Sequence, residues 1–227
     1  MLLCGNLQVQ DLKIIKKNRH AELVSASNNS EASFDKKILK QVQDDVLKNM
    51  QKKQIIIFSV ILAIATVVMR LYPHPWNFSP MGALFLFSGF YLPRKWMLLP
   101  LITLSVTDLI IGTYQIQVMM VVYGSYAIMM FGAHYIRSKG DKMASVFGLS
   151  IASAILFFIT TNFAHWMFFG GYAHNISGLM QAYVAGIPFF RNSLIGYVFY
   201  SAMFFGVYEL VNLSSSIKQK TSQIEVI

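Results

Sequence analysis

The sequence predicts an all-α membrane protein, a bundle of six transmembrane helices with both termini in the cytoplasm. Three observations lead to this fold class. Of the 227 residues, 55% are hydrophobic and only 13% are charged, whereas soluble domains carry about 25% charged residues. After Gln54, apolar runs of roughly 20 residues recur, the length of a helix that crosses a hydrocarbon layer of ~30 Å. The basic residues lie mostly at the ends of these runs.

Residues 1–49 are polar and differ from the rest of the chain. The letters HAELVSAS (20–27) and KILKQVQDD (37–45) resemble the translation of a dispersed repeat found in many bacterial genomes. This interpretation places the start of translation at Met50 and gives residues 1–49 no function of their own, since so polar a segment cannot build a core. The alternative is an amphipathic membrane-surface helix over 36–48.

Six apolar runs follow, and none shows the alternation of a membrane β-strand. They cover about Ile55–Leu71, Met81–Leu92, Trp96–Gly112, Ile116–Ile136, Ala144–Phe169 and Phe189–Leu213. The second run falls below the ~17 residues that a span needs unless its flanks join it. The predicted organisation is therefore an N-terminal extension (1–49), a membrane domain (50–215) and a short cytoplasmic tail (216–227).

The distribution of Lys and Arg fixes the expected orientation. With the N-terminus inside, the basic clusters at 52–53, 94–95, 137–142 and 218–220 all fall on the cytoplasmic side, and only Arg70 and Arg191 fall outside. This pattern follows the positive-inside rule at every connection. The net charge of +9 therefore reflects membrane topology, and nucleic acid is not an expected partner.

Polar residues gather in the half of the bundle that this orientation places outside. An ionisable group such as Asp108 costs at least ~2.5–3.5 kcal/mol in hydrocarbon unless it meets a partner, water or a ligand. We expect Arg191 to be its counter-ion in a ligand site. The alternatives are that the two residues form a purely structural ion pair, or that the Arg191 side chain extends to the lipid headgroups. Asn162 and His165 share one helical face with Trp166, where they could contact a ligand. The alternative is structural: interhelical hydrogen bonds made by Asn162 and His165, and an interfacial position for Trp166.

Two further stretches point to specific structures. Leu71–Pro80 holds three prolines within eight residues and predicts a stiff, non-helical wall of a polar pocket on the outer side. The loop 170–188 is expected on the same side. On the first span, Ser59 and Ala63 form a small-xxx-small pair, which allows close approach of a helix from a partner subunit or from within the bundle.

Familiar catalytic motifs are absent: the sequence has no HExxH, no nucleophile elbow and no phosphate loop. We therefore expect neither an enzyme nor a cofactor. His74 and His174 have no third ligand at a suitable spacing, so a metal site is not expected either.

Four segments, RLYPHPWNFSPMGALFLFSGFYL, VTDLIIG, FFITTNFAHW and GLMQAYVAGIPFFRNSLIG, resemble a group of bacterial integral membrane proteins of uncharacterised function. That group is similar to the substrate-binding S components of energy-coupling factor (ECF) transporters. The resemblance implies a six-helix protein of the bacterial cytoplasmic membrane that captures a small organic solute, such as a vitamin or precursor, from outside. It also implies a first loop that acts as a lid, and docking on a transmembrane T subunit and ATPase subunits, partly through Ser59 and Ala63.

The expected substrate-binding residues lie in the first outer loop, near the outer ends of the spans and in the second outer loop: Trp76, Asn77, Asp108, Asn162, Trp166, Gln181, Tyr183, Arg191 and Asn192. Aromatic rings would stack on a flat solute, and amides with the Asp/Arg pair would orient it. Asn162→Ala or Asp108→Ala should abolish uptake without loss of membrane expression. The alternatives are a membrane assembly protein, or a small enzyme acting on lipid head groups with Asp108 or His165 as base.

Overall fold

The computed structural model describes residues 37–38, 41–42, 45, 48–73, 75–139 and 142–224, with side chains up to residue 214. The chain divides into two units, Met1–Lys53 and Gln54–Ile227, and the helix bundle described below is the second. The surface helix considered for 36–48 falls largely outside the described residues.

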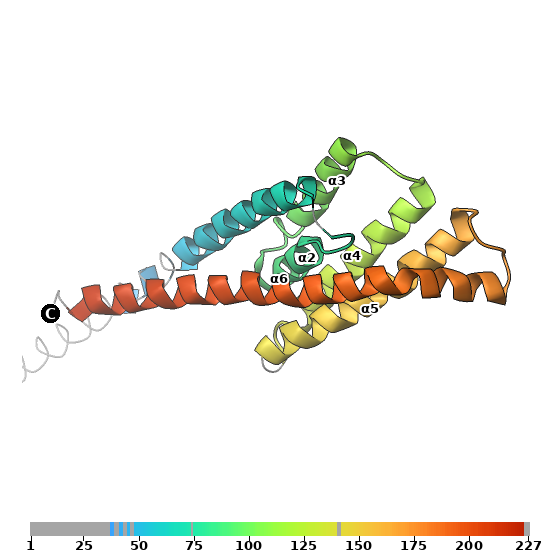
Figure 1. Ribbon diagram of the computed structural model, residues 1–227. Helices are drawn as coiled ribbons and strands as arrows, with labels where there is room; N and C mark the ends of the chain where they lie inside the picture. Colours follow the sequence, from blue (N-terminus) through green and yellow to red (C-terminus); the bar gives the residue numbers. More distant parts are fainter. Residues whose placement is uncertain are drawn as a thin grey trace, which may run out of the picture. The chain divides into compact units, whose positions relative to one another are not determined.

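All regular structure in the described residues is helical, as expected (Figure 1). The helices are Lys48–Leu71, α2 (Met81–Tyr91), α3 (Leu99–Ile111), α4 (Ile116–Ile136), α5 (Lys142–Phe168) and α6 (Ile176–Ile224). Four are long and apolar enough to cross a membrane: Lys48–Leu71, α4, α5 and the part Ile176–Ser214 of α6. With 11 and 13 residues, α2 and α3 measure about 16 and 20 Å at 1.5 Å per residue, short of a ~30 Å hydrocarbon layer.

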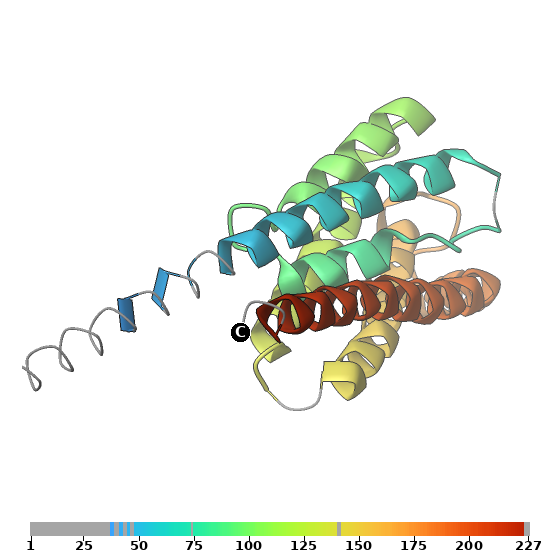
Figure 2. The same ribbon diagram turned by 90° about the vertical axis from the view of Figure 1, so that its left-hand side faces the viewer.

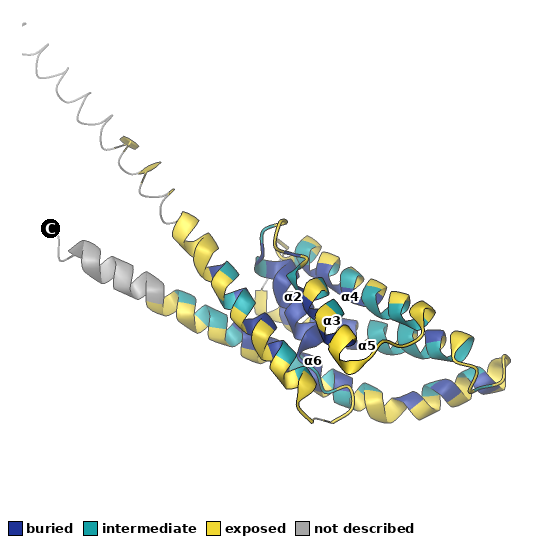
Figure 3. Cartoon of the chain, turned by 90° about the horizontal axis from the view of Figure 1, so that it is seen from above, coloured by how far each residue is buried: buried dark blue, intermediate teal, exposed yellow. Residues whose placement is uncertain are grey.

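The short helix α2 forms the centre of the bundle. Ten of its 11 residues are buried, and it contacts α3, α4, α5 and α6. It also lies beside the helix Lys48–Leu71, because the ring of Phe58 meets Phe87 of α2 and Tyr208 of α6. Figure 2 shows α2 between these two helices, and Figure 3 shows it dark blue beneath neighbours whose outer sides are exposed. A helix apolar on all sides suits such a buried position.

Two glycines bring other helices close to α2. A Cβ at Gly82 would overlap the ring of Tyr197 on α6, and one at Gly89 would overlap the backbone carbonyl of Met130 on α4. Since neither position has room for a methyl group, the packing of α2 requires glycine at both. This central helix is therefore fixed in place by close backbone contacts.

The far end of α2 is tied to α5 and α6 by a polar contact. The Tyr91 hydroxyl donates to Glu209 of α6, and the Lys142 ammonium, at the start of α5, lies 2.8 Å from the same carboxylate oxygen. Lys142 also lies over the ring of Tyr91. The C-terminal end of α2 therefore lies level with Glu209.

The last helix begins earlier than the sequence predicts. Its apolar run was expected from Phe189 after a loop over 170–188, but α6 begins at Ile176 and contains Pro188. The reason is a local cap: Asn175 Oδ1 accepts the Gly178 N–H at 2.8 Å, which satisfies one of the free donors of a helix start. An interior proline removes one hydrogen bond and bends a helix, but membrane helices tolerate it.

Candidate functional site

In the proline-rich connection Leu71–Pro80, the described residues 72–73 and 75–80 are non-helical, as expected. Pro75 and Phe78 close a β-turn, in which the Phe78 N–H donates to the Pro75 carbonyl at 3.0 Å. Asn77 adopts φ 62° in this turn. A positive φ at the third residue of a turn favours Gly or Asn, so Asn77 supports the turn through its backbone. His74 lies outside the described residues.

The connection is fastened to α6 at three points. The Asn192 amide donates to the Trp76 carbonyl at 3.0 Å, and the Trp76 ring meets Phe189 edge-on, with centroids 6.2 Å apart. The Phe78 ring packs against Tyr200 at 5.2 Å, where Gly196 leaves room for the Phe78 backbone. The indole of Trp76 is nevertheless 78% exposed. The connection therefore lies along α6 with Trp76 at its edge.

Two cavities lie between this connection and α4, α5 and α6. The first, of about 400 Å³, is lined by Arg70, Trp76, Asn77, Ser79, Leu104, Ile111, Tyr114, Val122, Tyr126, Phe157, Ser193 and Tyr197. The second, of about 540 Å³, is lined by Trp76, Asn77, Tyr114, Val118, Val122, Phe157, Thr161, Asn162, His165, Tyr172, Ala182, Ala185, Gly186 and Phe189. The two share Trp76, Asn77, Tyr114, Val122 and Phe157 and are therefore neighbours with a common wall.

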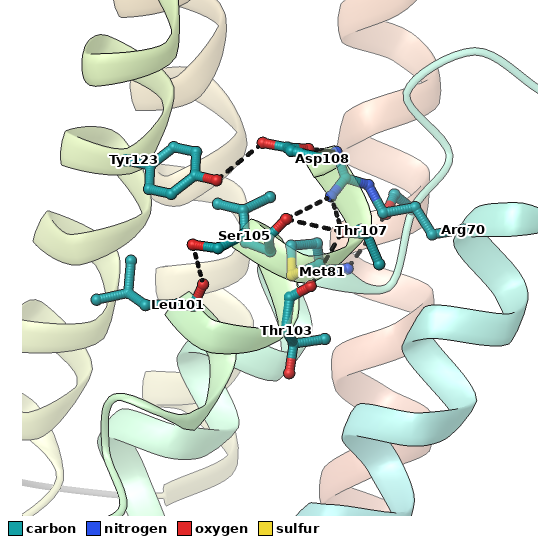
Figure 4. A network of polar contacts seen from close by, with 10 residues as sticks. Arg70, Met81, Leu101, Thr103, Ser105, Thr107, Asp108 and Tyr123 are labelled. Carbon is teal, nitrogen blue, oxygen red and sulfur yellow. Dashed lines mark hydrogen bonds and ion pairs between the residues drawn. The ribbon is translucent and has the colours of Figure 1, made fainter. Parts of the chain in front are cut away.

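An ion pair lies behind the first cavity (Figure 4). The Arg70 Nη2 lies 2.6 Å from Asp108 Oδ1, and Tyr123 donates its hydroxyl to Asp108 Oδ2 at 3.0 Å. The Arg70 Nη1 donates to the Thr107 hydroxyl and reaches the Leu104 carbonyl at 3.5 Å. Asp108 is 2% exposed and Arg70 20%, so the carboxylate is enclosed while the guanidinium borders the cavity.

The prediction that Arg191 is the counter-ion of Asp108 was wrong. Arg70 takes the place assigned to Arg191, which is exposed on α6. Arg70 stands in the last turn of the helix Lys48–Leu71, opposite the last turn of α3, where Asp108 lies. The sequence does contain a signal for this pair, since Arg70 is the only charged residue in the apolar stretch 54–71.

Two tyrosines bring polar groups into the first cavity. Tyr197 is 2% exposed, and its hydroxyl has no hydrogen-bond partner among the described residues; the Tyr126 hydroxyl lies close by. A buried polar atom without a partner is rare in proteins. In the connection after α3, Tyr114 lines both cavities and is 38% exposed.

The structure brings some of the predicted substrate-binding residues together. Trp76, Asn77 and Asn162 line the cavities. Asp108 and Asn192 do not line them but are hydrogen-bonded to two residues that do, Arg70 and Trp76 respectively. Asn162 donates to the Phe158 carbonyl at 2.8 Å and lies against Gly186.

The other predicted residues are not in the cavity walls. The Trp166 indole donates to the Ala173 carbonyl and the Tyr183 hydroxyl to the Ile159 carbonyl, both at 2.9 Å. Gln181 and Arg191 are exposed on α6. Gln181 and Tyr183 were expected in an outer loop over 170–188, whereas they belong to α6.

Ser59 and Ala63 lie inside the bundle. Ser59 is 1% exposed and donates to the Ile55 carbonyl, and Ala63 belongs to the hydrophobic core. Of the two alternatives for this small-residue pair, internal packing is the one observed. A partner subunit would therefore need another surface of the protein.

The residues that sequence reasoning missed come from α4, α5, α6 and the connection before α4. Tyr114, Tyr126, Phe157 and Tyr197 supply most of the aromatic wall of the first cavity. In the sequence, each is an ordinary aromatic residue in or beside an apolar run. Among the described residues, no group of three His, Cys, Asp or Glu side chains lies together.

Fold and cavities together define a helical protein in which four of the described helices are long and apolar enough to cross a membrane, with two partly open cavities that have aromatic and polar walls. The sequence profile of DUF6580, described as a family of unknown function, matches residues 48–221. The chain belongs to this family. Searches of curated proteins and of solved structures found no match.

Proposed function

We propose that this protein captures a small organic solute in the paired cavities, as the S component of an ECF-type importer in the bacterial cytoplasmic membrane. The observation that carries the proposal is the non-helical stretch 75–80, whose Trp76 and Asn77 line both cavities inside a helical bundle. A hydrocarbon layer offers no hydrogen bonds to irregular backbone, so such a segment is tolerated only where it is covered by protein or lines a cavity.

The contacts of α2 support this position. Phe78, just before α2, packs against Tyr200, and Tyr91, at the end of α2, contacts Glu209. These contacts lie nine residues apart on α6, or about 13 Å along the helix. The segment Leu71–Pro80 therefore lies beside earlier residues of α6, within the helix that is long enough to span a membrane. Broken segments of this kind form the binding sites of many transporters.

The six-span topology is part of the proposal. We infer that α2 and the connection before it together cross the membrane once, and that α3 and the non-helical residues 112–115 after it together cross it once. This assignment keeps both termini inside and preserves the positive-inside pattern. The exposed Arg94 and Lys95, between α2 and α3, then lie at the cytoplasmic surface together with Lys142.

The cavity walls suit a flat organic solute. Indole, phenol and phenyl rings provide apolar faces for stacking, and the few polar groups among them can orient the ligand. Transport would require a T subunit and ATPase subunits as partners, since the sequence has no phosphate loop.

The test begins with native mass spectrometry of protein purified in mild detergent. We expect a retained small molecule in the unmodified protein and in Tyr135→Phe, because Tyr135 is exposed on α4. Tyr197→Phe and Asn162→Ala should lose it while lowering the unfolding temperature by no more than about 4 °C, since each change removes at most one hydrogen bond worth about 1 kcal/mol. Retention by both cavity variants would contradict the assignment of the site.

A second experiment addresses the transporter. Affinity purification from the native membrane should recover ATPase subunits, and solute uptake should stop when those subunits are deleted. Uptake that continues without any ATPase would exclude the S-component role while leaving solute binding in place.

A further inference from the structure

We propose that the ligand of these cavities is uncharged. This inference rests on the proposed function and adds the chemical class of the solute. It is based on the charges that surround the cavities.

Among the described residues, Arg70 is the only permanently charged side chain in either wall, and no Asp or Glu lines either cavity. The charge of Arg70 is already compensated, since Asp108 Oδ1 lies 2.6 Å from its Nη2. The first cavity therefore presents hydrogen-bond donors with almost no net charge.

A cationic ligand would be poorly matched to this wall. It would enter next to a guanidinium, and the only nearby carboxylate is enclosed and paired. Burying a charge without a partner is costly, so cations should be excluded.

An anionic ligand would meet Arg70 but also the Asp108 carboxylate behind it. That carboxylate cannot turn away easily, because Tyr123 holds its second oxygen at 3.0 Å. Like charges a few ångströms apart repel strongly in surroundings of low dielectric constant. The repulsion by Asp108 therefore offsets much of the attraction by Arg70.

The wall does offer partners for a neutral polar group. A guanidinium carries five N–H donors, and the contacts of Arg70 with Thr107, Leu104 and Asp108 do not use all of them. The Tyr197 hydroxyl has no partner among the described residues. A carbonyl oxygen or a ring nitrogen of an uncharged heterocycle would satisfy these groups, between the rings of Tyr126 and Phe157.

The test uses the full chain in nanodiscs at pH 8, where an ordinary imidazole is neutral. It is incubated with a library of water-soluble metabolites that includes matched probes: quinoline-3-carboxamide, quinoline-3-carboxylate and the cationic N-methylquinolinium-3-carboxamide. Affinity selection with mass spectrometry identifies the compounds retained by the unmodified protein and by Tyr135→Phe but lost by Tyr197→Phe.

We expect these site-specific compounds to be uncharged. A set dominated by anions or cations would overturn the inference and leave the proposed function standing. Absence of any site-specific compound would contradict the proposed function itself.

The variant Asp108→Asn provides an independent test of the charge argument. It keeps the size of the side chain but removes the charge, so Arg70 becomes uncompensated. We expect the ratio of carboxylate to carboxamide binding to rise about tenfold or more. An unchanged ratio in a folded variant would overturn the role of Asp108; if the variant does not fold, the charge of the compounds bound by the unmodified protein decides the question.

Discussion

The ion pair between Arg70 and Asp108 gives the sharpest prediction about stability. Asp108→Ala would remove the acceptor of two hydrogen bonds, from Arg70 and from Tyr123. The guanidinium would then border the cavity without its counter-charge, and the Tyr123 hydroxyl would lose its partner. The structure therefore predicts that this variant loses both stability and solute binding, the second because Arg70 is no longer held in place.

The size of the effect follows from the enclosure of the pair. Removing one partner of a buried ion pair costs about 3–5 kcal/mol, and the lower end applies because the Arg70 side chain is 20% exposed. For a chain of 150–250 residues, 1 kcal/mol shifts the melting temperature by about 2–4 °C. We therefore expect Asp108→Ala to melt about 6–12 °C lower.

The assay is thermal unfolding in detergent, followed by intrinsic tryptophan fluorescence. The double variant Arg70→Met/Asp108→Leu should recover at least half of the loss, because replacing both charges by apolar groups is often neutral. The control Arg94→Ala, at an exposed position, should melt within about 2 °C of the unmodified protein. A double variant less stable than either single variant, or an unaffected Asp108→Ala, would refute the reasoning.

Three further predictions concern packing, backbone and surface charge, each measured by thermal unfolding. Gly89→Ala should lower the free energy of unfolding by about 1–3 kcal/mol, because the added methyl group would overlap the α4 backbone. The control Gly132→Ala has open space around it and should be neutral or stabilising by up to about 1 kcal/mol. Equal effects of the two changes would contradict the packing of α2. Asn77→Val should be destabilised by at least about 1 kcal/mol and Asn77→Gly should not, because of the positive φ. Lys142→Ala should cost less than about 1 kcal/mol, since its pair with Glu209 is exposed.

The sequence was sufficient to predict the helical structure of the described residues, the presence of helices long and apolar enough to cross a membrane, and the bounds of α4. Hydropathy and run length report on these features directly. It also identified the non-helical proline segment. The start of α6 was missed, since Pro188 and the polar residues before it resemble a loop, and only the Asn175 cap reveals a helix start. A proline within an apolar region can therefore lie at a bend inside a helix as readily as at the end of one.

The candidate site was predictable only in part, for a physical reason. Asp108 and Asn162 could be singled out because polar groups are costly in a membrane. Their surroundings depend on how helices distant in sequence pack, and this packing gave Asp108 a partner on the first helix rather than on the last. The aromatic wall formed by Tyr126 and Tyr197 gave no signal in the sequence, because apolar-facing tyrosines are common in membrane helices.

The same packing bears on whether the segment Leu71–Pro80 moves. The proposed S-component role would favour a lid, whereas the structure fastens the segment to α6 by Asn192, Phe189 and Tyr200. Its prolines also restrict the backbone before any ligand arrives, which lowers the entropy cost of ordering it. We therefore expect a fixed rim.

The pair Phe78→Cys and Gly196→Cys, in a Cys4→Ser background, tests this directly. The Phe78 Cα lies 3.4 Å from the position of a Cβ at residue 196, which is close enough for a disulfide, and neither residue lines a cavity. A rim predicts that oxidised and reduced protein bind solute with the same affinity and exchange rate. A lid predicts that oxidation slows entry and release together, since the segment could then no longer leave α6. Exchange that becomes slow on oxidation and recovers on reduction would therefore show that the attachment to α6 has to open in every binding cycle.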